Sequence, residues 1–144
     1  PFAALSLQPV DVQFAESLWL RVAGLPANSR AGAMLPLRLV WERAAAPPPN
    51  LVRFVHLLDA AGNKVAQVDG QVSDAFGPLP ITAWAQGTPV DDLITLALPA
   101  DLAPGDYTLI AGLYDWQSGA RLAAGGERAR PDGAALPGTV KIVE

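Results

Sequence analysis

The chain has 144 residues, a hydrophobic fraction of 51% and a net charge of −4, which together predict one folded domain of acidic character. Its Lys and Arg residues form no run longer than Arg128-Ala129-Arg130. Nucleic acid is therefore not expected as a partner, because binding to phosphates requires a basic stripe. The absence of cysteine excludes a disulfide framework and a thiolate metal site.

The ends of the chain and its apolar runs bear on its context. The sequence starts at Pro1 rather than Met, so we expect a piece of a longer protein, to which a signal peptide or membrane anchor can belong. The longest run without charge, residues 75–90, is too short for a membrane span and is interrupted by Gly and Pro. The fragment itself is therefore not expected to cross a membrane.

The first half of the chain predicts short strands. Residues 1–16 lack a clean period and are expected to lead into the domain, with a short strand at most around residues 10–14. Residues 18–24 alternate, and residues 34–43 alternate most cleanly, which is typical of a half-buried antiparallel strand. The three prolines at 47–49 predict a stiff connector that crosses from one sheet to the other.

The second half continues this pattern. Strands are expected at residues 51–59 and 63–70, joined by a short hairpin loop that contains Gly62. The segment 73–90 is rich in Pro and Gly and is either a bridge between sheets or a surface flap. A strand at 93–98 follows, then a short return strand at residues 121–122. Residues 125–138 are the most loop-like, and residues 139–143 are expected to close a sheet edge.

The stretch at residues 104–115 is the centre of this arrangement. Pro104-Gly105 predicts a tight turn, and the residues after it alternate at the period of a strand. The apolar face is made by Tyr107, Leu109, Ala111 and Leu113. With no long helix and no β-α-β alternation, the chain is expected to be an all-β, antiparallel two-sheet β-sandwich of immunoglobulin or fibronectin-III type, with seven to nine strands in one domain over residues 1–144.

Tyr107 carries a first resemblance. The sequence L-A-P-G-D-Y-T-L at residues 102–109 resembles the tyrosine corner of Greek-key sandwiches. In that motif a tyrosine at the start of a late strand donates its hydroxyl hydrogen to a backbone group upstream. A structural role is therefore expected for Tyr107.

Three blocks carry a broader resemblance. They are L-P-L-R-L-V-W at residues 35–41, then F-V-H-L-L-D at 54–59 followed by V-A-Q-V-D at 65–69, and finally the run from 98–107 to 112–115 and 119–122. Together they resemble the C-terminal extracytoplasmic β-sandwich domain of bacterial multi-spanning glycosyltransferase-like membrane proteins, which are related to protein mannosyltransferases. Residues 80–84 keep the Thr and Trp that follow a Pro in that family. Trp116 and Gln117 depart from it, because they replace its more usual Pro-Ala.

The resemblance implies context rather than catalysis. In that family the transfer chemistry is attributed to membrane-embedded loops, which the chain does not contain. We therefore expect a non-catalytic accessory or interaction domain on the extracytoplasmic side of a bacterial membrane, as part of a larger protein whose partner is an unknown protein or a glycan. Two alternatives stay open: a carbohydrate-binding module that uses surface aromatics, and, least supported, a hydrolytic enzyme.

Four residues are expected to be structural. Trp41 shares the apolar face of its strand with Leu37 and Leu39 and is expected in the core, and Tyr107 is assigned above. His56, the single histidine, shares a face with Phe54 and is expected to be a satisfied core residue, with Gln67 opposite it across the hairpin.

The candidate ligand contacts are aromatic. Trp84, Tyr114 and Trp116 are the candidates for a platform, because an exposed ring stacks on the apolar face of a sugar or on another protein. No catalytic residue is assigned, because a hydrolase triad needs a nucleophile beside His56 and the chain has neither Cys nor a Gly-x-Ser-x-Gly elbow.

No cofactor or metal is expected either. Asp91 and Asp92 are adjacent and point to opposite faces if they lie on a strand, so they are expected to be a solvated loop end. The oxygen ligands available for calcium are Asp59, Asn63, Asp69 and Asp74. These four residues lack the dense spacing of a calcium loop.

Overall fold

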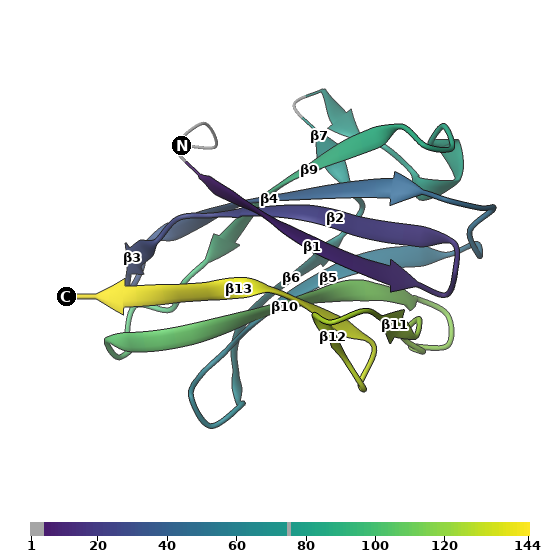
Figure 1. Cartoon of the computed structure of the whole chain (residues 1–144). Helices are drawn as coiled ribbons and strands as arrows, with labels where there is room; N and C mark the ends of the chain where they lie inside the picture. Colours follow the sequence, from purple (N-terminus) through teal and green to yellow (C-terminus); the bar gives the residue numbers. More distant parts are fainter. Residues whose placement is uncertain (1–4, 75) are drawn as a thin grey trace.

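The computed structural model describes residues 5–74 and 76–144 and is almost entirely β-structure (Figure 1). Two large sheets face each other, as the all-β, two-sheet prediction requires. In the described residues, the helical structure consists of one 3₁₀ turn, η2 (Ile81–Ala83). The same residues contain no helix with the length and apolar character of a membrane span.

The first sheet, sheet A, has the strand order β11-β1-β2-β4-β9. Its bounds are β11 (Ala124–Gly125), β1 (Ser6–Phe14), β2 (Leu18–Leu25), β4 (Met34–Arg43) and β9 (Pro89–Ala97). Strand β1 begins before the expected residue 10 and pairs along its length with β2, so residues 6–14 are part of the sheet rather than a lead-in. The expectation included residues 10–14 but missed the first part of this strand, because a bulge between Pro9 and Val12 interrupts its alternation.

The second sheet, sheet B, has the order β12-β13-β10-β5-β6, and β3 adds a short parallel pairing to β13. The bounds are β12 (Ala129–Arg130), β13 (Ala134–Val143), β10 (Gly105–Asp115), β5 (Leu51–Leu58), β6 (Lys64–Gly70) and β3 (Asn28–Arg30). The loop expected at residues 125–138 is wrong in its last part, since β13 already begins at Ala134. Pro137 and Gly138 hid this strand, and the ladder with β10 shifts register beside them.

The core lies between the sheets. The expected inward faces of β4 and β10 are confirmed: Leu35, Leu37, Leu39 and Trp41 are buried against Tyr107, Leu109, Ala111 and Leu113 in one cluster. The chain crosses from sheet A to sheet B through the Pro-rich connector between β4 and β5, as expected. It crosses again between β9 and β10, where the Tyr107 hydroxyl donates a 2.7 Å hydrogen bond to the Ala103 carbonyl, the contact that the corner motif predicts.

The segment between β6 and β9 is a bridge between the sheets. It contains the short pair β7 (Ser73–Asp74) and β8 (Gly77–Pro78), followed by η2. Val72, Ile81 and Trp84 from this segment are buried in the core cluster. Of the two alternatives for residues 73–90, the bridge is therefore the one that the described residues form.

Candidate functional site

Strand β5 has apolar residues on both faces, and each face also carries one polar residue. Arg53 and Val55 face the core between the sheets, whereas Phe54 and His56 face outward. The outer residues pack in a separate cluster that contains Phe54, Leu58, Ile110 and Ala134. The expectation that His56 is a core residue is therefore wrong: its side chain is 14% exposed on the outer face of sheet B.

The expected neighbour of His56 is correct. In the pairing of β5 with β6, His56 lies opposite Gln67, and Phe54 lies opposite Asp69. The Lys64 ammonium donates a hydrogen bond to Oε1 of the Gln67 side-chain amide. The His56 ring makes no hydrogen bond within the described residues, and its Nε2 lies 3.9 Å from the Asp69 carboxylate. Both ring nitrogens therefore keep their hydrogen-bonding capacity.

Gly112 makes room for the aromatic floor of this region. Gly112 lies opposite Phe54 on β10, and a Cβ at this position would be 2.6 Å from the Phe54 ring. The Phe54 ring occupies that space, with its centroid 5.0 Å from that of His56. The Arg121 guanidinium lies over the Phe54 ring at 4.3 Å from its centroid, which is a cation–π contact.

Tyr114 and Asp69 close one side of the region. The Tyr114 hydroxyl donates a 2.9 Å hydrogen bond to Oδ2 of Asp69, and Oδ1 of Asp69 is the atom nearest to His56. One carboxylate therefore lies between the phenol and the imidazole. Asp69 retains acceptor capacity for a further donor, because a carboxylate offers about four lone-pair sites.

Two pKa values depart clearly from their ordinary values among the described residues, and both belong to this region. Burial is the main cause that lowers the pKa of His56 from 6.5, followed by the positive charge of Lys64. Burial, together with the hydrogen bond to Asp69, raises the pKa of Tyr114 from 10.0. Shifted pKa values gather at functional sites more often than elsewhere on a protein.

These side chains surround a shallow hollow of about 250 Å³, which we call the sheet B hollow. Its lining comes from β5, β6, the end of β10 and the loop that follows it. The residues are Phe54, His56, Lys64, Gln67, Asp69, Tyr114, Gly119 and Arg121. Tyr114 is the single predicted ligand residue in this hollow, and the sequence analysis missed the parts played by Asp69 and Arg121. The position of Asp69 could have been predicted from the hairpin register. The sequence predicts that Gln67 lies opposite His56, and Asp69 follows Gln67 by two residues and so lies on the same face.

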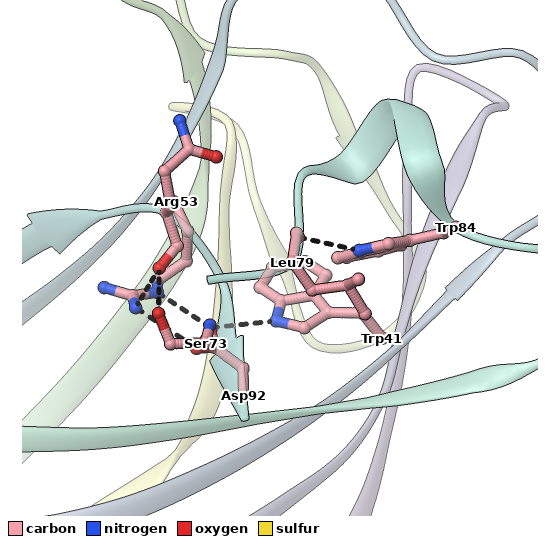
Figure 2. A network of polar contacts seen from close by, with 7 residues as sticks. Trp41, Arg53, Ser73, Leu79, Trp84 and Asp92 are labelled. Atoms are coloured by element: carbon pink, nitrogen blue, oxygen red, sulfur yellow. Dashed lines mark hydrogen bonds and ion pairs between the residues drawn. The ribbon is translucent and has the colours of Figure 1, made fainter. Parts of the chain in front are cut away.

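The predicted aromatic platform of Trp84, Tyr114 and Trp116 does not form. Trp84 is 3% exposed and donates its indole hydrogen to the Leu79 carbonyl at 3.0 Å, as Figure 2 shows. It borders an apolar hollow of about 370 Å³ beside β9, whereas Trp116, which is 56% exposed, borders a third hollow of about 220 Å³ with Pro48. Each of the three rings therefore borders a different hollow. In addition, the bridge segment buries Trp84, so its ring is not available as a platform.

The structure also corrects the prediction for Asp92. We expected this residue at a solvated loop end, which is wrong, because Asp92 is fully buried on β9. Asp91 does point to the opposite face, where it accepts a 2.8 Å hydrogen bond from Arg38. Because Arg38 already pairs with Asp91, and Asp92 lies in the core, the adjacent carboxylates do not cooperate.

A buried polar network surrounds Asp92 (Figure 2). Arg53 binds its carboxylate through Nε at 2.7 Å and Nη2 at 3.1 Å. The Trp41 indole and the Ser73 amide each donate a further hydrogen bond at 3.2 Å. Trp41 is fully buried, as expected, and its N–H finds the acceptor that a buried indole requires. This network joins the sheets and has the features of a structural element rather than of an accessible site.

The calcium candidates do not gather. Asp59 accepts hydrogen bonds from the amides of Ala61 and Asn63 and thereby closes its own hairpin loop. Asp69 lies in the sheet B hollow. In the described part of the chain, no group of three or more His, Cys, Asp or Glu side chains lies close enough to hold a metal ion.

The chemistry available in the sheet B hollow is therefore that of hydrogen bonding and charge: an imidazole, a carboxylate, an amide, a phenol and two cations around an aromatic floor. Similarity to known proteins adds no assignment to this geometry. No family profile matches the chain, and no curated protein resembles it at a significant level.

Proposed function

We propose that the chain is a non-catalytic interaction domain that binds its partner through the sheet B hollow. The observation that carries this proposal is the hydrogen-bonding capacity left at His56 and Asp69, on a floor fixed by Phe54 and Gly112. A small number of convergent polar groups around an aromatic surface is typical of a binding site.

We propose binding rather than catalysis because of the chemical groups that line the hollow. A hydrolase mechanism of the Ser–His or Cys–His type needs a hydroxyl or thiol nucleophile within hydrogen-bond reach of His56. The described residues that line the hollow include no Ser, Thr or Cys. Tyr114, the remaining hydroxyl, donates its proton to Asp69 and has a raised pKa, so it is a poor nucleophile at neutral pH.

We further propose the immunoglobulin or fibronectin-III type for the sandwich. The order β2-β4-β9 on one side and β13-β10-β5-β6 on the other supports it, because this arrangement fits strands A-B-E and G-F-C-C′ of that type. The hydrogen bond from Tyr107 to Ala103 at the start of β10 supports it as well, since the tyrosine corner belongs to strand F.

The resemblance of the three sequence blocks supports a proposal about the context of the domain. We propose an accessory domain of a larger bacterial membrane protein, on the extracytoplasmic side. The full reading frame tests this first, because transmembrane helices upstream of Pro1 are expected. A second test is protease treatment of spheroplasts, in which the cytoplasmic membrane is the remaining barrier and the domain should be cleaved without further permeabilisation. Protection until the cytoplasmic membrane is permeabilised would refute the extracytoplasmic location.

Arrays that carry both glycans and peptides test the binding function. The expected result is binding that is lost in Asp69→Asn and retained in Asp91→Asn. Both substitutions remove one carboxylate from a sheet face, and the second lies on sheet A, away from the hollow. If no array component binds, or if both variants bind like the wild type, the hollow is not the binding site.

The carbohydrate-binding module remains a second candidate in an altered form. It loses the platform that includes Trp84, because that ring is buried. It keeps Tyr114, which borders the hollow beside hydrogen-bonding groups of the kind that recognise hydroxyls.

A further inference from the structure

The sheet B hollow has the size of a site for one small ring. Its volume of about 250 Å³ lies below the range of pockets that enclose a drug-sized ligand, about 300–1,000 Å³. Its floor is the Phe54 ring, with the Tyr114 ring 6.2 Å away. A compact ligand with one apolar face can rest on such a floor and direct its polar groups to the sides.

The polar groups of β5 and β6 in the hollow can form hydrogen bonds with ligand hydroxyls. His56 is neutral at pH 7, because its pKa is lowered from 6.5, so it offers one donor and one acceptor. Asp69 retains acceptor capacity beside its bond to Tyr114, and the exposed Gln67 amide lies opposite His56. A ligand with several neighbouring hydroxyls, each both donor and acceptor, matches this mixed set better than an apolar ligand does.

The charges around the hollow favour an anionic group on the same ligand. Lys64 and Arg121 line the hollow as cations, against the single carboxylate of Asp69. The Asp132 carboxylate lies 3.6 Å from the Arg121 guanidinium and is also bound by Arg130. With these neighbours counted, the three cations Lys64, Arg121 and Arg130 lie near the two carboxylates of Asp69 and Asp132, so a small local excess of positive charge remains although the whole chain has a net charge of −4. Arg121 is held in place by its contact with Phe54 and by a 3.2 Å hydrogen bond to the Asp132 carbonyl, so its guanidinium is already ordered before a ligand arrives.

We propose that the sheet B hollow binds a single sugar ring that carries a carboxylate, of the uronic-acid class. The hydroxyls of the ring bind His56, Asp69 and Gln67, and its carboxylate pairs with Arg121 or Lys64. This inference rests on the proposed binding function and adds the ligand class to it. A shallow, open site for one ring predicts a Kd on the order of 1 mM.

The test is a titration of the whole chain with glucuronate, glucose and acetate, followed by the amide shifts in two-dimensional NMR. We expect glucuronate to shift the amides of β5, β6 and the end of β10, with glucose and acetate each binding about five-fold more weakly. Arg121→Gln should weaken the binding of glucuronate by the same factor and leave the affinity for glucose unchanged. Arg38→Gln removes a cation from the outer face of sheet A and is the matched control. This variant should change neither the affinity for glucuronate nor the affinity for glucose.

The spectra also report whether each variant is folded. Equal binding of glucose and glucuronate would overturn the acidic ligand class, and acetate binding as tightly as glucuronate would reduce the hollow to a simple anion site. If none of the three probes shifts these amides at about 20 mM, the sugar class is wrong. The array experiment on Asp69→Asn would still decide the binding function in that case, so the two failures are distinguishable.

Discussion

Asp92→Asn should strongly destabilise the domain. The Asp92 carboxylate is fully buried and accepts four hydrogen bonds, two from Arg53 and one each from Trp41 and Ser73. The amide replaces one acceptor oxygen by a donor that faces other donors, and it leaves the Arg53 charge buried without a counter-charge. Removing one partner of a buried pair costs about 3–5 kcal/mol, which corresponds to a fall in Tm of about 6–20 °C for a chain of this size.

Urea unfolding followed by circular dichroism measures this loss, and the neighbouring residue supplies the control. Asp91→Asn removes an equivalent carboxylate from a pair with Arg38 whose side chains are 44% and 34% exposed. An exposed pair contributes less than about 1 kcal/mol, so this variant should unfold close to the wild type. If Asp92→Asn loses no more free energy of unfolding than Asp91→Asn, the buried network does not stabilise the fold and the reasoning fails. A paired replacement, Arg53→Met with Asp92→Leu, should recover only part of the loss, because it removes the unpaired charge but leaves the Trp41 indole and the Ser73 amide without their acceptor.

Three further predictions concern the corner, the floor and the histidine. Tyr107→Phe removes the hydrogen bond to Ala103 and should cost about 1 kcal/mol in urea unfolding. Gly112→Ala places a methyl group 2.6 Å from the Phe54 ring and should cost about 1–3 kcal/mol in the free energy of unfolding. It should also lower the affinity for the array ligand. An unchanged affinity would show that the Phe54 floor does not contribute to binding. Because the pKa of His56 is lower in the folded state than its ordinary 6.5, the stability that it contributes is complete above pH 6.5 and is lost as the pH falls through the folded pKa. His56→Gln should remove this part of the pH dependence between about pH 7.5 and 5, and an unchanged slope would contradict the assignment. The charged and titratable groups that face the ring are Lys64, Asp69, Tyr114, Arg121 and Asp132.

Local alternation predicted the strands that have one polar face. In β4, the residues at 35, 37, 39 and 41 are apolar and Arg38 and Glu42 are not, so the inward face follows from the sequence alone. Alternation also gave the inward face of β10, although Ile110 on its outer face is buried as well. The turn before β10 identified the hydrogen bond of Tyr107. The hairpin of β5 and β6 followed from its short Gly-containing loop, and this also gave the correct pairing of His56 with Gln67.

The faces of β5 were not predictable in this way. Both of its faces are apolar apart from one polar residue each, and the sequence analysis placed His56 in the core because it shares a face with Phe54. Burial of Arg53 depends on Asp92, which lies 39 residues away on the other sheet. Local periodicity contains no information about such a partner. Trp84 was misplaced for a related reason, because its burial depends on the packing of a bridge that has no regular period.

The buried pair and the sheet B hollow act on the same strand from opposite sides. Successive residues of a strand point to opposite faces, so a slip of one residue would bring Phe54 into the core and Arg53 to the surface. Such a slip would break the bonds of Arg53 to Asp92 and would also remove the Phe54 ring from the space above Gly112. Because both faces of β5 are apolar, hydrophobic burial alone discriminates poorly between the two registers. The ion pair therefore supplies much of the discrimination, and the geometry of the hollow depends on a charge that no ligand can reach.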